Sequence, residues 1–272
     1  MSEFLVNSKR SNMKIDKVIM SCDDNETYLN LWPYVSKVCK LTLGITPVLF
    51  HITNEYSDFI PDKYGIVKKI KKHPELPTAF QSQIYRMYGT KFFYNENCLI
   101  SDIDMLTFNK EYFVKQVEGY SDDCLITYLY DAYDLSRPDC QQIWGLYRIP
   151  MCYNLAKGKT FFNLLDLNCD FNEFAERIYN FDFGYVVPEF HRDEVFLGRT
   201  MYRNHHDIEI IKLKRDIQNV NDIPRRVEKK HFYVMNSDAI YSKELVDCHV
   251  ASDWQSNMDI FKRKINDILV YA

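Results

Sequence analysis

The chain has 272 residues and a formal net charge of −4, with 46% hydrophobic and 26% charged residues. This is the balance of an ordinary globular protein, and the length is sufficient to bury a sizeable core. Because the net charge is negative and the one basic run is short, no nucleic-acid partner is expected.

The N-terminus predicts no targeting or membrane segment. Residues 1–14 are polar and are expected to form a flexible arm, followed by a single domain over residues 15–272. No apolar stretch has the length of a signal-peptide core or a membrane span, so we expect a cytoplasmic protein without an anchor. The eight cysteines show no CxxC pair or zinc spacing, which favours buried free thiols.

The first part of the chain has a strand–helix–strand pattern. Apolar runs predict strands over residues 17–21 and 47–52. Apolar positions at helical spacing predict a helix over residues 30–43, which ends at Gly44. Parallel strands joined through a helix belong to a sheet covered by helices on both faces.

The following elements continue the pattern and then lose it. We expect strands over residues 65–70, 98–100 and 124–130, and helices over residues 78–88 and 253–270. Thr78 is the expected cap of its helix. After about residue 135 short pieces alternate with loops, so the strand–helix rhythm weakens.

Two carboxylates follow the apolar strand at residues 98–100. Asp102 and Asp104 are two residues apart, and in extended backbone this spacing directs both side chains to the same side. The carboxyl ends of strands in an open α/β sheet are where ligands bind. Two oxygen donors there suit Mn²⁺ or Mg²⁺, which combines carboxylates with phosphate oxygens and water.

These residues resemble the GT-A glycosyltransferases, which carry an Asp-x-Asp motif behind a helix that bears an arginine. The run from Gln81 to Gly89, with Arg86, is similar to the glycogenin and lipopolysaccharide galactosyltransferase group. The resemblance implies a Rossmann-like GT-A fold with a mixed, mostly parallel sheet and helices on both faces. Residues 15–135 would bind the nucleotide sugar and residues 136–272 the acceptor. Arg86 would lie near the donor diphosphate or the Asp-x-Asp carboxylates.

The loop after the first strand matches the same group. There, this loop cradles the nucleotide, so Asp23 or Asp24 would accept hydrogen bonds from the base or ribose. Tyr28 would stack on the base. The resemblance implies the following nucleotide-sugar site: Ser21, Cys22, Asp23, Asp24, Tyr28, Arg86, Asp102 and Ile103.

The segment from His249 to Trp254 resembles the His-x-x-x-x-Trp ending of the group, in which the histidine joins the metal. The implied metal ligands are Asp102, Asp104 and His249, with Asp104 the firmest. Asp102 alternatively faces the ribose or Arg86. The glycine and lysine that follow the histidine in that group are missing here, so no phosphate clamp is implied at this position.

An acidic pair opens an apolar helix at Asp193 and Glu194. The resemblance implies that one of them meets the acceptor or the transferred sugar, and Asp193 is preferred. An inverting enzyme needs a carboxylate there as general base, whereas a retaining enzyme uses it to position or stabilise the sugar cation. The implied catalytic residues are Asp193, Glu194 and Arg86. Acidic residues at a helix start can also simply complement the helix dipole.

A further resemblance covers residues 17–254. The stretch from Ile149 to Phe161 is similar to glycosyltransferase-like proteins of large DNA viruses of algae, which implies a viral enzyme in the host cytoplasm.

The function implied is transfer of a sugar from a UDP or GDP sugar to a hydroxyl of a glycan or glycoprotein, assisted by Mn²⁺ or Mg²⁺. The glycogenin-like features favour retention of configuration. One alternative is a sugar-phosphate nucleotidyltransferase, although no glycine lies between Lys17 and Leu43 to form its phosphate loop. The other is a non-catalytic carbohydrate-binding protein, which would explain the 20 Tyr and 18 Phe but not the acidic pair.

Overall fold

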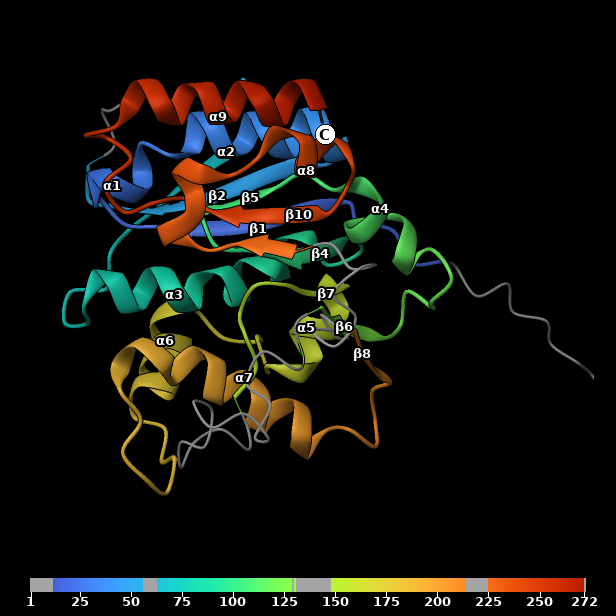
Figure 1. Ribbon diagram of the computed structural model, residues 1–272. Helices are drawn as coiled ribbons and strands as arrows, with labels where there is room; N and C mark the ends of the chain where they lie inside the picture. Colours follow the sequence, from blue (N-terminus) through green and yellow to red (C-terminus); the bar gives the residue numbers. More distant parts are fainter. Residues whose placement is uncertain (1–11, 56–62, 129, 131–147, 214–224, 272) are drawn as a thin grey trace, which may run out of the picture.

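The computed structural model describes residues 12–55, 63–128, 130, 148–213 and 225–271 (Figure 1). Residues 1–11 of the expected N-terminal arm lie outside this range. Met13 is buried in the core, and its N–H donates to the carbonyl of Tyr120 at 2.7 Å. Packing against the domain therefore begins before residue 14.

One mixed sheet organises the chain. Its strands are β1 (Lys17–Cys22), β2 (Thr46–Ile52), β3 (Ile66–Ile70), β4 (Asn97–Ile100), β6 (Leu125–Thr127), β7 (Asn154–Lys157) and β8 (Ile210–Lys212). They lie in the order β3-β2-β1-β4-β7-β6-β8. β1 pairs in parallel with β2 and β4, β2 with β3, and β6 with β8, whereas β7 is antiparallel to β4 and β6. The mostly parallel α/β sheet is thus confirmed.

Helices cover both faces of this sheet. The α-helices are α1 (Glu26–Leu29), α2 (Trp32–Val38), α3 (Thr78–Tyr88), α4 (Lys110–Phe113), α5 (Gly158–Leu164), α6 (Phe171–Tyr179), α7 (Arg192–Arg203), α8 (Ser237–Tyr241) and α9 (Met258–Tyr271). Short turns of π- or 3-10 helix are η1 (Cys39–Leu43), η2 (Gly89–Phe93), η3 (Lys115–Val117), η7 (Glu189–His191) and η8 (Lys229–Val234).

Alternating side chains of β1 build the two halves of the core. Val18 and Met20 belong to a cluster with residues of α2 and α9, whereas Ile19 belongs to a cluster with α3, α5, α6 and α7. This follows from the two-residue period of a strand. Figure 1 shows α2 and α9 on one side of the sheet and α3 on the other.

A smaller sheet joins the middle of the chain to its end. β5 (Met105–Thr107), β10 (Leu245–His249) and β9 (Arg225–Val227) lie in the order β5-β10-β9, with β10 antiparallel to β5 and parallel to β9. A buried ion pair fixes β9 to β10, because Arg226 donates to the carboxylate of Asp247 at 2.9 Å. The Tyr153 hydroxyl donates to the same carboxylate at 2.8 Å.

Several expected elements are present with altered ends. The helix expected over residues 30–43 is α2 followed by the π-helical turn η1, and Gly44 ends it at a φ of 78°. The strand expected over residues 124–130 is shorter, and residue 129 lies outside the described range. The helix expected from residue 253 begins at Met258, after a series of turns.

The prediction that Thr78 caps α3 was wrong. Pro77 occupies the cap position, and Thr78 is the first residue of the helix. The Thr78 hydroxyl donates instead to the Asp23 carboxylate at 2.8 Å. This hydrogen bond joins α3 to the loop after β1.

Among the described residues, none of the helices has the length and apolar character that crossing a membrane would require. The seven cysteines in the described part of the chain are free, and all except Cys169 are buried.

Candidate functional site

The candidate site lies beyond the carboxyl ends of β1, β2, β3 and β4, where parallel strands place their following loops at one edge of the sheet. Polar side chains from several elements gather there. They come from the loop after β1, the segment between β4 and β5, the helices α3 and α7, and the small sheet.

Arg86 joins two carboxylates that are far apart in sequence. It projects from α3 and forms ion pairs with Asp102, after β4, and with Asp193, in the first turn of α7. The distance from the Arg86 guanidinium to Asp193 Oδ2 is 2.7 Å. Asp193 is only 1% exposed, and burial raises the pKa of its carboxyl although Arg86 opposes this effect. Arg86 therefore contacts one of the two Asp-x-Asp carboxylates, that of Asp102, together with the Asp193 carboxylate.

Glu194 has its own partners beside Asp193. Its carboxylate accepts from Arg148 Nε at 2.5 Å and lies 3.3 Å from His191 Nδ1. Its backbone N–H donates to Asp193 Oδ1 at 2.8 Å. Both expected acidic residues thus lie at the start of α7, but each faces a different basic group.

Asp104 and His249 meet across the small sheet. Antiparallel pairing of β5 with β10 sets Met105 opposite His249, and the Val250 N–H donates to the Asp104 carbonyl at 2.9 Å. This register brings His249 Nε2 to 3.4 Å from Asp104 Oδ2. Lys229, at the start of η8, places its ammonium 2.7 Å from the same oxygen.

Burial and neighbouring charges have opposite effects on the pKa values of Asp104 and His249. Burial alone would raise the pKa of the Asp104 carboxyl, but the hydrogen bond and charge of His249, together with Lys229, lower this pKa to about 2. Burial would lower the pKa of His249, but its contacts with Asp104 and Glu228 raise it. Asp104 is therefore a buried carboxylate in its charged form.

The two Asp-x-Asp carboxylates do not point the same way. β4 ends at Ile100, and residues 103–104 form a turn before β5, so the extended backbone assumed from the sequence is absent between Asp102 and Asp104. Asp102 faces Arg86, while Asp104 faces His249 and Lys229. Of the alternatives for Asp102, the geometry matches contact with Arg86.

Asp104 and His249 are a suitable donor pair for Mn²⁺ or Mg²⁺. A carboxylate oxygen and an imidazole nitrogen approach each other, and such ions take further ligands from phosphate oxygens and water. Within the described part of the chain, no group of three or more His, Cys, Asp or Glu side chains could hold a metal ion. Asp104 and His249 supply two donors, so an ion held here would need further ligands.

The two aspartates after β1 have different partners. Asp24 accepts from His51 Nε2 at 2.8 Å, at the end of β2, and pairs with Lys72 at 2.5 Å, after β3. Asp23 accepts from Thr78 and from the Asn25 N–H at 3.1 Å. Asp24 thus joins three neighbouring strand ends, while Asp23 orders its own loop against α3.

The other expected nucleotide-site residues surround this loop. The Ser21 hydroxyl donates to the Ser82 carbonyl on α3, and Cys22 is 3% exposed, with burial raising the pKa of its thiol. Ile103 is also buried, at 6% exposure, whereas Tyr28 is 37% exposed. Of these side chains, Tyr28 is the one accessible for stacking on a base.

The helix α1, which carries Tyr28, is joined to the segment that follows His249. The indole N–H of Trp254 donates to the Thr27 carbonyl at 3.0 Å, and Gln255 donates to the Glu26 carbonyl at 3.4 Å. These bonds hold α1 beside the segment that follows His249. The two ends of the expected site, distant in sequence, are therefore joined directly.

Sequence reasoning missed the basic partners of the acidic residues. Lys229 lies between Glu228 and Lys230, and a charged run of this kind is typical of a solvent-exposed surface. His51 lies in an apolar strand, and Lys72 in a basic edge run. The pairing of β2 with β1 and β3, and of β10 with β5 and β9, brings these side chains to the site, so no local signal identified them.

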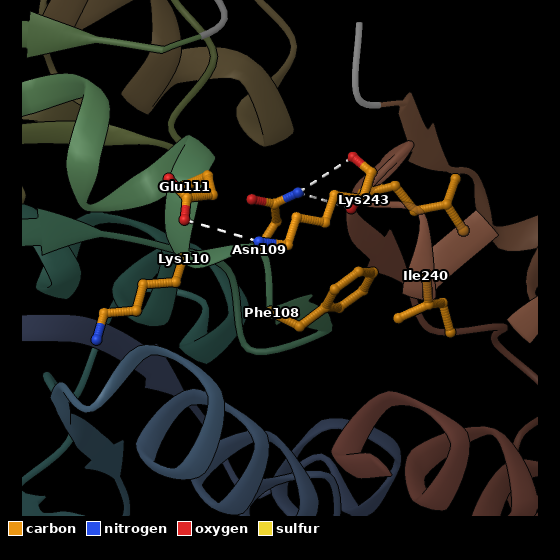
Figure 2. A pocket seen from close by; sticks show the side chains of 7 residues that line it. Phe108, Asn109, Lys110, Glu111, Ile240 and Lys243 are labelled. Atoms are coloured by element: carbon orange, nitrogen blue, oxygen red, sulfur yellow. Dashed lines mark hydrogen bonds and ion pairs between the residues drawn. The ribbon is translucent and has the colours of Figure 1, made fainter. Parts of the chain in front are cut away.

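A small hollow lies elsewhere, at the opposite end of the β5–β10 pair from Asp104 and His249. It has a volume of about 40 Å³, against the roughly 300 Å³ or more of a typical ligand site. Its lining residues are Phe108, Asn109, Lys110, Glu111, Ile240, Lys243 and Leu245 (Figure 2). Asn109 donates to the carbonyls of Lys243 and Leu245, so its polar groups join α4 to the turn before β10.

Comparisons with known proteins support the fold. No protein-family model matches the sequence, and no curated protein matches it. The galactosyltransferase LgtC, solved with donor and acceptor sugar analogues, superposes with a TM-score of 0.50 and 12% identity, over 93% of this chain and 95% of LgtC. The glycosyltransferase GlyE of Streptococcus pneumoniae superposes with a TM-score of 0.51 and 10% identity, over 95% of this chain and 63% of GlyE. At these identities the likeness shows the fold, which is the GT-A fold of these glycosyltransferases.

Proposed function

We propose that this protein is a glycosyltransferase that moves a sugar from a UDP or GDP sugar to a hydroxyl of a glycan or glycoprotein. The observation that carries the proposal is the meeting of Asp104 with His249 beside the Arg86-linked pair of Asp102 and Asp193. These groups lie at the strand ends of a GT-A fold, where a nucleotide sugar would bind.

Asp104 and His249 would hold the Mn²⁺ or Mg²⁺ ion. When bound, the ion would neutralise charge on the departing diphosphate. Arg86 would orient Asp102 and Asp193 through its two ion pairs. Because the side chain of Asp102 is 26% exposed, it would remain accessible to the donor. Tyr28 would stack on the base, and the loop of Asp23 and Asp24 would contact the base or ribose.

Asp193 and Glu194 on α7 would have different roles. Asp193 is 1% exposed, and its two oxygens accept from Glu194 N–H and from Arg86, so it is suited to positioning. Glu194 is more exposed, at 15%, and faces Arg148 and His191. We therefore assign contact with the transferred sugar or the acceptor hydroxyl to Glu194. Retention of configuration is part of the proposal because of the glycogenin-like motifs.

Thermal stability with nucleotide tests the proposal. Ligand binding stabilises the folded state by about 2.7 kcal/mol at a concentration 100 times the Kd. UDP or GDP with Mn²⁺ should therefore raise the melting temperature of the wild type, and much less that of Asp104→Asn. Asp259→Asn, an exposed carboxylate on α9, is the matched control and should respond as the wild type does. A wild type that no nucleoside diphosphate stabilises would contradict the proposal.

Product analysis separates the alternatives. With sugar nucleotides and Mn²⁺, a glycosyltransferase slowly releases the nucleoside diphosphate and free sugar even without an acceptor. A nucleotidyltransferase instead forms pyrophosphate from a nucleoside triphosphate and a sugar phosphate. A carbohydrate-binding protein forms neither product. Glu194→Gln should reduce the release of sugar while leaving stabilisation by nucleotide in place.

A further inference from the structure

We propose that Lys229 is a displaceable counter-ion of Asp104: it yields this carboxylate to a divalent cation and then binds the diphosphate of the donor. The inference rests on the proposed function, because it concerns the same site. It assigns a role to a residue that the motifs did not indicate.

The contacts of Asp104 show a competition for one oxygen. The Lys229 ammonium lies 2.7 Å from Asp104 Oδ2, and His249 Nε2 lies 3.4 Å from the same atom. Asp104 is buried, at 8% exposure, whereas the side chain of Lys229 is 36% exposed. The carboxylate is therefore fixed in place, while the lysine reaches it from the solvent side.

A divalent cation and an ammonium group cannot share this oxygen without strong repulsion. Like charges at contact distance repel, and the repulsion is larger in a partly buried site than in water. Asp104 is held by the β5–β10 pairing, and His249 belongs to β10 itself. Lys229 carries its charge on a flexible four-carbon stem, so it is the partner that moves.

The displaced ammonium has a ready partner in a diphosphate. Lys229 begins η8, so its backbone remains beside Asp104 when the side chain moves. Burial would lower the pKa of the Lys229 ammonium, but Asp104 and, after it, Tyr28 raise this pKa. A nucleotide stacked on Tyr28, with its phosphates directed towards Asp104, would thus bring negative charge to Lys229.

The other basic side chains at the site already have fixed partners. Arg86 is held by Asp102 and Asp193, and Lys72 is held by Asp24. The segment after His249 brings no lysine before Trp254. Lys229 is therefore the described cation best placed to receive the phosphates.

Two binding measurements with opposite expected signs test the proposal. In Lys229→Gln, Mn²⁺ alone, followed by electron paramagnetic resonance, should bind about tenfold more tightly than in the wild type, because the competing charge is removed. In saturating Mn²⁺, the nucleoside diphosphate that stabilises the wild type should bind about tenfold more weakly by calorimetry, because its phosphates lose a cation. Lys229→Arg, which retains the charge, should keep diphosphate binding, and the exposed neighbour in Lys230→Gln should change neither constant.

Each outcome has a defined meaning. Unchanged or weaker Mn²⁺ binding in Lys229→Gln would overturn the counter-ion role, and unchanged diphosphate binding would overturn the phosphate role. A wild type that binds neither Mn²⁺ nor any nucleoside diphosphate would overturn the proposed function and this inference together. A wild type that binds both, with Lys229→Gln indistinguishable from it, would overturn the Lys229 inference alone.

Discussion

Replacing Arg86 with Met should destabilise the fold strongly. The change keeps a long apolar side chain on α3 but removes the guanidinium between Asp102 and Asp193. Asp102 is 26% exposed and can be solvated, whereas Asp193 is 1% exposed and loses its partner at 2.7 Å. Most of the expected loss therefore comes from Asp193.

The magnitude follows from leaving a buried charge uncompensated. Removing one partner of a buried ion pair costs about 3–5 kcal/mol. Asp193 keeps the hydrogen bond from the Glu194 N–H at 2.8 Å, so we expect a loss near the lower limit, about 3 kcal/mol. The measurement is the free energy of unfolding from urea titrations followed by circular dichroism.

A double-mutant cycle identifies the source of this loss. Asp193→Asn keeps the size of the side chain and removes the charge, so in the Arg86→Met background it should restore part of the stability. The expected coupling between the two positions is about 1–3 kcal/mol. Arg263→Met, at an exposed position on α9, is the matched control. Additive effects of the two single substitutions, or a loss below about 1 kcal/mol in Arg86→Met, would refute the reasoning.

Two further substitutions test the scaffold of the site. Gly44→Ala should lower the free energy of unfolding in urea by about 1 kcal/mol, because Gly44 has a φ of 78°. An added Cβ meets nothing within 4 Å, so the whole loss comes from backbone strain. Gly119→Ala is its control, since that site is equally open without a positive φ, and an equal loss in both would contradict this reason. Trp254→Phe should cost about 2 kcal/mol through lost packing and the lost bond to the Thr27 carbonyl at 3.0 Å, and should weaken nucleotide-dependent stabilisation. An unchanged urea midpoint in Trp254→Phe would contradict that packing role.

The sequence by itself determined the elements whose signal is local. The buried strands β1, β2 and β4, the helix α3 and the position of the acidic pair at the start of α7 all follow from apolar periodicity. The placement of Asp102 and Asp104 after a strand also follows, because a strand end is marked by the change from apolar to polar residues. The periodicity indicated an α/β sheet, and the resemblance of the Arg86 helix and the Asp102–Asp104 segment to glycosyltransferases implied the GT-A fold.

Only the tertiary structure decided which side chains contact one another at the site. The turn at residues 103–104 separates the two carboxylates, so that Asp102 meets Arg86 and Asp104 meets His249 and Lys229. Lys229 and Asp104 are separated by more than a hundred residues, and pairing of β10 with both β5 and β9 brings them together. A charged side chain looks the same in sequence whether it faces solvent or a buried partner. Its role depends on which strands pair, and the long-range packing of the chain decides that.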